Sequence, residues 1–250
     1  ENKGLSATLN EMVDWAEGKY FTGCASDDIM LPSKISLLVE KLESSDDSYS
    51  VAFGDAIFID DNSNEVFIDR KTGEYTTEEN GSKFFLDYYT FERDFDYKDE
   101  KSFGSYKTLL AGNYLPAMSY VIKLDKIREV GAWTSGNTIE DWEMWLKLSK
   151  NYKFAYIDEP VAFYRWHDSN TCKTMKFELV RDSIQLFENE REYALNRGYE
   201  NILYSTLVNL IIQLRIHGKT LFIKKIFKYS INPAFICAFT IKIFNKIKKS

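Results

Sequence analysis

The sequence lacks several features that would place a chain in a familiar class. It contains three cysteines, Cys24, Cys172 and Cys237, an odd number without metal-ligand spacing, so no disulfide framework is expected. A reduced, cytosolic setting is the default for such a chain. There is no signal-peptide pattern and no internal repeat. The longest uncharged apolar run, residues 229–241, is interrupted by Asn232-Pro233 and is too short to span a bilayer.

Acidic residues are absent from the C-terminal part of the chain. Residues 1–200 hold 23 basic and 38 acidic residues, so the net charge of −6 combines an acidic body with a basic end. In residues 201–250 the charged residues are Arg215, Lys219, Lys224, Lys225, Lys228, Lys242, Lys246, Lys248 and Lys249. They alternate with Ile, Leu and Phe, a pattern typical of a helix lying on an anionic membrane surface. Nucleic-acid binding is not expected, because the body is acidic and lacks a groove-binding motif.

The residues that are present suffice for one large core, since 44% of the 250 residues are hydrophobic. Apolar periodicity predicts an alternation of strands and helices followed by helices alone. We expect helices over residues 5–16, 33–42, 124–130, 141–150, 175–197, 202–217, 221–229 and from 233 onward. We expect strands over residues 19–25, 49–60 with a bend at Gly54-Asp55, 66–68 as a returning hairpin strand, 119–123, 153–157 and 161–166. The highly charged stretch 92–107 is predicted to be a solvated loop.

The adjacent carboxylates Asp27-Asp28 follow the apolar run 19–25. A strand that ends in two acids places oxygen ligands at the carboxyl edge of a sheet, where open α/β sheets bind ligands. Two neighbouring carboxylates repel each other unless a cation or a hydrogen-bond donor separates them. The pair therefore indicates a site for a metal and a phosphate, and the alternative is that it only caps the following helix.

Two further polar clusters lie at predicted element ends. Glu140-Asp141 opens a helical stretch, and the run from Tyr164 to Asn170 follows a strand. Clusters at element ends, far apart in sequence, can converge on one cleft. At the helix start, Asp141 should be favoured in its charged form by the helix dipole. The alternative for this pair is an ordinary acidic first turn beside packed tryptophans.

These clusters, together with their flanking residues, resemble the family-2 glycosyltransferases. The matching residues are Asn2 to Gly4, Asn10, Ala16 to Phe21, Ser26-Asp27-Asp28, Gly131 to Trp133, Glu140-Asp141 and Arg165 to His167. The resemblance implies an α/β fold of the GT-A nucleotide-diphospho-sugar transferase type, with a Rossmann-like mixed sheet. It assigns residues 1–172 to an N-terminally truncated GT-A domain, because family members carry strand and helix units before this point. Residues 173–250 form the helical C-terminal region.

The resemblance also implies roles for the acidic loop and the later strand end. Asp28 would coordinate Mn²⁺ or Mg²⁺ that bridges the donor diphosphate, and Asp27 would lie near the ribose. Ser26 stands where the family motif more usually has a first acid. His167 would complete the metal shell, which would favour Mn²⁺, whereas a lone histidine beside aromatics is more often a core residue. Arg165 would clamp the diphosphate, with a surface ion pair as the alternative.

On the acceptor side the resemblance makes Asp141 the general base and leaves Glu140 to orient a donor or acceptor group. The stretch from Asn113 to Ser119 would face the acceptor. Tyr114 and Trp133 could stack on sugar rings, although packing in the core is the more common role for such aromatics.

The function implied is an inverting, metal-dependent glycosyltransferase. It would move a sugar from a nucleotide-sugar, most often a UDP-sugar in this family, to a lipid-linked saccharide in bacterial surface-polysaccharide biosynthesis. Its location would be cytoplasmic and peripheral at the inner face of the cell membrane. A nucleotidyltransferase-like chemistry is disfavoured because no basic triphosphate-binding loop is present. The alternative from another class is an inactive carbohydrate-binding or scaffolding module of a membrane polysaccharide-assembly complex.

Overall fold

The structure, a computed structural model, describes residues 3–249 without the side chains of His217 and residues 245–249. Asn2 of the family resemblance and the basic side chains of Lys246, Lys248 and Lys249 therefore lie outside the described residues. The chain divides into two compact units. The first comprises Glu1–Leu109, Asn113–Gly136 and Glu140–Asp168, and the second comprises Leu110–Gly112, Asn137–Ile139 and Ser169–Ser250.

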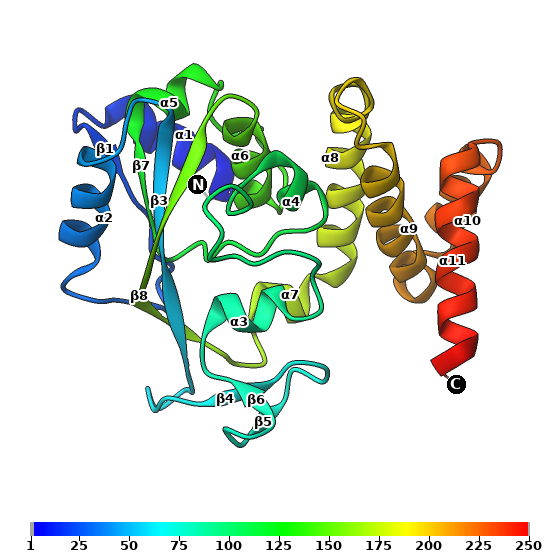
Figure 1. The fold of residues 1–250 in the computed structure, drawn as a ribbon, viewed down its shortest axis with the longest axis horizontal. Helices are drawn as coiled ribbons and strands as arrows, with labels where there is room; N and C mark the ends of the chain where they lie inside the picture. Colours follow the sequence, from blue (N-terminus) through cyan, green and yellow to red (C-terminus); the bar gives the residue numbers. More distant parts are fainter. Residues whose placement is uncertain (1–2, 250) are drawn as a thin grey trace. The chain divides into compact units, whose positions relative to one another are not determined.

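A five-stranded mixed sheet forms the centre of the first unit (Figure 1). Its order is β1 (Tyr20–Phe21), β7 (Tyr120–Lys123), β3 (Tyr49–Ile59), β8 (Lys153–Arg165) and β2 (Ile29–Met30). The pair β3 and β8 is parallel, and the other neighbours are antiparallel. Strand β3 is buried from its second residue to its last, which explains its nearly continuous apolar sequence.

The predicted bend at Gly54-Asp55 is confirmed. The register between β3 and β8 shifts at this point, where Asp55 faces Pro160. A Cβ on Gly54 would lie 2.8 Å from the carbonyl oxygen of Glu159, so the close approach of the two strands requires glycine. The prediction of two separate strands in 153–166 is wrong, because β8 runs on through Pro160. A proline is tolerated there because the irregular register demands no regular ladder hydrogen bond from its nitrogen.

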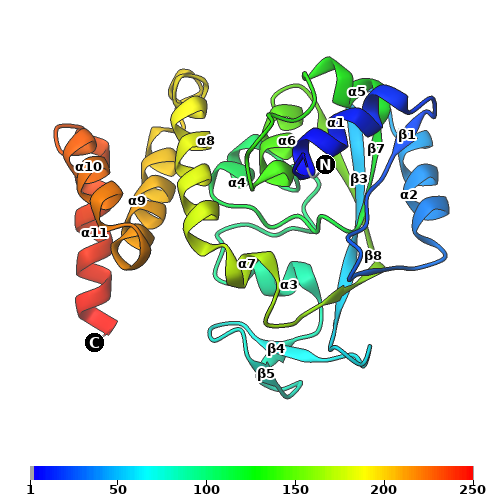
Figure 2. The same cartoon turned by 180° about the vertical axis from the view of Figure 1, so that it is seen from behind.

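Helices cover both faces of the sheet (Figures 1 and 2). Leu38 and Leu42 of α2 (Lys34–Glu43) pack on one face, against small and branched residues of β3, β7 and β8. On the other face the Trp145 ring of α6 (Glu140–Ser149) lies 5.0 Å from that of Phe53 and 5.1 Å from that of Tyr120, measured between centroids.

Residues 92–105 contain neither helix nor strand, which confirms most of the loop predicted over 92–107, whereas residues 106 and 107 open α4. The prediction that the loop is solvated is confirmed for most of residues 92–101, which are exposed, but not for the aromatic residues between the charges. These are anchored on the domain: Phe103 lies 5.9 Å from Phe53, Phe95 lies 4.9 Å from Tyr114, and Tyr97 packs on Tyr156.

The remaining elements of the first unit surround this core. They are α1 (Leu5–Trp15), α3 (Phe85–Thr90), most of α4 (Tyr106–Leu110), α5 (Leu124–Glu129), and a small sheet of β5 (Tyr75–Thr76), β4 (Phe67–Asp69) and β6 (Gly81–Ser82).

The predicted return of residues 66–68 onto β3 is mostly wrong, since β4 pairs with β5 and β6 and only an isolated bridge joins Ile59 to Glu65. Ile68 instead packs with Phe58 and Trp166 in a second apolar cluster.

The second unit is mainly helical, as the periodicity predicted. Its helices are α7 (Thr171–Thr174), α8 (Lys176–Asn196), α9 (Glu200–His217), α10 (Lys219–Tyr229) and α11 (Pro233–Lys249). Helix α9 contacts α8, α10 and α11, and its Tyr204 ring meets those of Tyr229 and Phe235. Among the described residues no helix is both long and apolar enough to cross a membrane.

Candidate functional site

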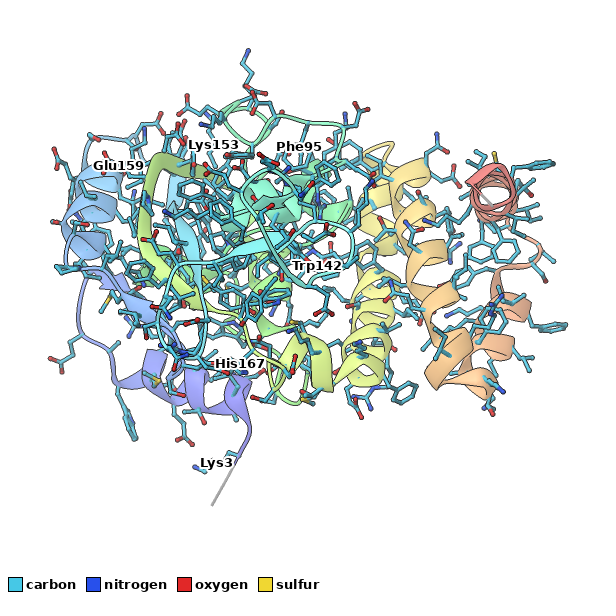
Figure 3. All side chains as sticks on the ribbon, turned by 90° about the horizontal axis from the view of Figure 1, so that it is seen from below. Lys3, Phe95, Trp142, Lys153, Glu159 and His167 are labelled. Carbon is cyan, nitrogen blue, oxygen red and sulfur yellow. The ribbon has the colours of Figure 1, made fainter. Side chains whose placement is uncertain are left out.

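The acidic pair Asp27-Asp28 lies in the turn between β1 and β2. The prediction that the acids directly end a strand is wrong, because β1 stops at Phe21. The pair is instead tied to the end of β8, far away in sequence. Asp28 Oδ1 accepts a hydrogen bond of 2.9 Å from the backbone N–H of Arg165, the last residue of that strand. Asp27 Oδ2 lies 3.1 Å from Nε2 of His167, which is labelled in Figure 3.

Burial of Asp28 raises the pKa of its carboxyl to about 6. The hydrogen bond from the Arg165 backbone lowers this pKa, the negative charge of Asp27 raises it, and the charges of Arg165 and His167 lower it. Burial thus disfavours the ionised form of Asp28. A cation bound beside the carboxylate would stabilise this form.

The guanidinium group of Arg165 binds protein atoms on two loops. Its Nε donates to the carbonyl oxygen of Asp27 over 2.9 Å, Nη1 donates to the carbonyl of Asp60, and Nη2 donates to Ser63 Oγ. Through these bonds Arg165 stabilises the conformation of the loop that contains Asp27. Its role as a diphosphate clamp stays a prediction.

The second acidic pair begins α6. Asp141 Oδ2 accepts a hydrogen bond of 2.7 Å from the Asn113 side chain, and Oδ1 accepts one of 2.6 Å from the backbone of Trp142. Burial nevertheless raises the pKa of Asp141, and both bonds only oppose this rise. Burial, followed by the charge of Asp141, raises the pKa of Glu140 to about 7. The expectation that the helix start favours the charged form of Asp141 is therefore outweighed by desolvation.

Tyr120 of β7 borders the two acidic regions, and no sequence pattern selected it. Its hydroxyl lies close to Gly23, in the segment that leads to Asp27. A Cβ on Gly23 would lie only 3.0 Å from this hydroxyl oxygen. Burial raises the pKa of Tyr120, and the charges of Asp141 and Glu140 raise it further. The acidic loop and the start of α6 thus border the same tyrosine.

Lys34, the first residue of α2, lies beneath the acidic loop and is fully buried. Its Nζ donates to the carbonyl oxygens of Gly23 at 2.9 Å and Met118 at 2.8 Å. Burial lowers its pKa to about 8, while negative charge on Cys24 and Asp28 opposes the shift. Sequence reasoning missed this residue. The available signal was a lysine in the first turn of a helix, where a cation opposes the helix dipole.

A divalent cation at the acidic loop would need ligand atoms from a bound substrate in addition to those of the protein. Among the side chains that the structure describes, those of residues 3–244 other than His217, no group of three or more His, Cys, Asp and Glu could hold a metal ion. Asp28 and His167 are near enough for His167 to lower the pKa of Asp28. One carboxylate and one imidazole suit Mn²⁺, and phosphate oxygens commonly supply the remaining ligands of such ions.

The two aromatics considered for sugar stacking belong to the core. Tyr114 is 1% exposed, and its hydroxyl accepts a hydrogen bond from the Gly104 backbone. Trp133 is 7% exposed and lies 6.0 Å from Phe21. The packing interpretation of both residues is therefore confirmed.

Comparison with known proteins agrees with this architecture. The model of the family described as glycosyl transferase family 2 matches residues 1–107. A structure of S. aureus TarS 1-349 in complex with UDP-GlcNAc is 11% identical with a TM-score of 0.52, over 94% of this chain and 60% of that chain. The chain thus spans less than two thirds of the length of that chain. The GT-A fold with a helical C-terminal region is confirmed, and the family match supports sugar transfer in general.

A second structure is that of the mannosyltransferase PcManGT from Pyrobaculum calidifontis, in complex with GDP-Man and Mn²⁺. It is 10% identical with a TM-score of 0.45, over 97% of this chain and 67% of that chain. The comparison with curated proteins found no match.

Proposed function

We propose that this chain transfers a sugar from a nucleotide-sugar donor to a saccharide acceptor, with inversion at the anomeric carbon. One observation carries the proposal: Asp27, Asp28 and His167 meet at the end of β8, and Tyr120 borders both the loop that leads to them and Glu140-Asp141. A donor site at the first cluster and a base for the acceptor at the second would then lie around one tyrosine. The family match over residues 1–107 and the GT-A fold support the same chemistry.

On the donor side, Asp28 and His167 would hold a divalent cation, Mn²⁺ or Mg²⁺, together with the donor diphosphate. When bound, this cation would neutralise the charge that develops on the departing nucleoside diphosphate. Asp27 would face the ribose, and Arg165 would keep the loop in position through its bonds to the Asp27 and Asp60 carbonyls. A UDP-sugar is the proposed donor.

On the acceptor side, Asp141 would act as the general base in a single displacement. The acceptor oxygen attacks the anomeric carbon, the bond from that carbon to the diphosphate oxygen breaks, and the hydroxyl proton passes to the carboxylate. The raised pKa of Asp141 suits this task, because a base works best when its pKa approaches the working pH. The Asn113 side chain fixes the orientation of the carboxylate, and Glu140 would position a sugar hydroxyl.

The proposed acceptor is a lipid-linked saccharide of bacterial surface-polysaccharide synthesis, with the enzyme at the inner face of the cell membrane. The support for this part is the C-terminal segment, where basic residues alternate with apolar ones and acids are absent. A lipid carrier keeps the growing saccharide at a membrane surface, so an enzyme that acts on it needs to work there.

The test is turnover of a panel of nucleotide-sugars, with and without Mn²⁺, first with water and then with a lipid-linked saccharide as acceptor. We expect one donor to be consumed in a metal-dependent reaction. Asp28→Ala should lose metal-dependent nucleotide binding, whereas Asp141→Asn should bind nucleotide normally and lose turnover. Asp125→Asn, which changes an exposed acid on α5, is the matched control and should behave as the wild type.

Failure to turn over any donor, combined with no nucleotide binding, would contradict the proposal. That result would favour the alternative of an inactive carbohydrate-binding or scaffolding module. Binding of the chain to saccharides, without nucleotide binding, would support this alternative.

A further inference from the structure

The helices α10 and α11 expose large apolar side chains. On α10, Ile223 is 65% and Phe227 is 82% exposed, and Ile231 in the following turn is 88% exposed. Helix α11 adds Ile236, Ile241, Ile243 and Phe244, all exposed. We call these seven residues the C-terminal apolar face. Isolated exposed apolar residues are ordinary, but a concentration on two consecutive helices marks an interaction surface.

Specific contacts fix which side of α10 is exposed. Glu188 Oε1 of α8 accepts hydrogen bonds from Lys225 at 2.7 Å, Lys228 at 2.9 Å and the Tyr229 hydroxyl at 2.8 Å. The Tyr229 ring also stacks on Phe235 with centroids 5.1 Å apart. With Tyr229 buried and Lys225 turned toward Glu188, the opposite side of the helix carries Ile223 and Phe227.

Charge accompanies the apolar side chains on α10. At 100° per residue, Lys219 and Lys224 fall on either side of the stripe made by Ile223 and Phe227. Residues 201–250 contain no acid that would repel a negative surface. An apolar stripe bordered by lysines matches the boundary between acyl chains and headgroups of an anionic bilayer.

We propose that the C-terminal apolar face docks on an anionic phospholipid bilayer. Ile223, Phe227 and Ile231 enter the acyl boundary, and Lys219 and Lys224 contact lipid phosphates. Docking from one side agrees with the finding that no described helix is long and apolar enough to span a membrane. The inference concerns the second unit alone and does not depend on sugar transfer, so the two proposals can fail separately.

The test is co-sedimentation of the full chain with vesicles of phosphatidylcholine, alone or mixed with phosphatidylglycerol. We expect binding only to the anionic vesicles and a decrease with added salt. Phe227→Asp should weaken binding by about tenfold or more, from the loss of one buried aromatic side chain. Lys224→Gln should weaken it by about fivefold. Trp15→Asp removes an equally exposed aromatic residue on α1, 78% exposed, and should bind as the wild type.

Circular dichroism melting confirms that each variant is folded, since all the changed side chains are exposed. Phe227→Trp offers a second readout, because a tryptophan that enters the bilayer shifts its fluorescence to the blue. Three results would overturn the proposal: no binding of the wild type to anionic vesicles, equal binding of Phe227→Asp, or a dimer in solution that Phe227→Asp dissociates while vesicles remain unbound. The last result would assign the face to a second copy of the chain.

Discussion

At the scale of single residues, Asp55 is a buried carboxylate whose ionisation costs stability. It lies in β3 at 5% exposure and accepts hydrogen bonds from the backbones of Leu86 and Ala56. Burial raises its pKa to about 7, the two hydrogen bonds oppose the shift, and the charges of Asp87 and Asp158 add to it. The folded state therefore binds this proton more tightly than the unfolded state does.

Stability should consequently fall as the pH rises from about 4, the pKa of an unfolded aspartate, to about 7. Asp55→Asn removes this loss. We expect a gain of about 1–3 kcal/mol in the free energy of unfolding at pH 8, which shrinks to about a third at pH 5. Urea unfolding at the two pH values measures it, with Asp125→Asn as the control. A gain independent of pH would show that ionisation of Asp55 is not its cause.

Lys34 is a second residue whose burial has a testable consequence. Its ammonium group satisfies the carbonyls of Gly23 and Met118, and Met in its place would fill the same space without donors. We expect Lys34→Met to lower the free energy of unfolding, by about 1–3 kcal/mol for each carbonyl left unpaired. Amide hydrogen exchange in residues 22–28 should accelerate.

Lys41→Met, which changes a half-buried lysine on the same helix, is the control for Lys34→Met. Replacement of the buried lysine without any change in exchange at residues 22–28 would mean that Lys34 does not hold the acidic loop.

At the scale of elements, the contact between the segment before β7 and the start of α6 opposes the rise that burial causes in the pKa of the proposed base. Asn113 donates to Asp141 Oδ2, and this bond lowers the pKa that burial has raised. Asn113→Ala should raise the pKa of Asp141 further, because the bond that opposes the effect of burial is lost. The acid limb of the pH profile of kcat should move to higher pH, so that the loss of activity is greater at lower pH. An equal loss at every pH would point to a change in acceptor binding instead.

The sequence predicted the elements whose signals are local. Apolar periodicity was enough for α1, α2 and the C-terminal helices, and the Gly54-Asp55 bend followed from glycine in a buried strand. Predictions failed where distant packing decides. The aromatics of residues 92–105 find partners on the sheet that no local pattern specifies, and β4 pairs with strands that follow it rather than with β3.

The same distinction applies to the candidate site. Residue types at element ends marked the clusters that contain Asp27, Asp28, Glu140, Asp141 and His167, and the family resemblance supplied their predicted roles. The contact between Asp27 and His167 spans 140 positions of sequence, and the roles of Tyr120 and Lys34 depend on backbone atoms of Gly23 and Met118. The direction of the Asp141 shift depends on burial, which overrides the helix dipole. Such features arise only once the chain is folded.

At the scale of the whole molecule, the net charge of −6 is a poor guide to partners, because acids and bases are separated along the chain. Exposed charges further apart than the Debye length, about 10 Å at 0.1 M salt, act almost independently. The charge of the segment that touches a surface then decides binding. All the charged residues of 201–250 are basic, so the acidic character of the whole molecule does not argue against the proposed docking on an anionic surface.

One carboxylate, that of Glu188, holds the basic residues of α10 in their orientation. Glu188 holds Lys225, Lys228 and Tyr229, and its own side chain is only 11% exposed. Glu188→Gln keeps the shape but removes the charge, and we expect a loss of about 1–3 kcal/mol from the weakened hydrogen bonds. Helix α10 should loosen, so trypsin should cleave after Lys225 and Lys228 faster than in the wild type.

The matched control is Glu192→Gln, an exposed acid of the same helix. Anionic vesicles should restore protection in Glu188→Gln, because the apolar stripe held in the bilayer keeps α10 helical even without its contact to α8. Cleavage that is fast in the variant and remains fast on vesicles would contradict docking of α10 on the bilayer, while its packing on α8 would still depend on Glu188.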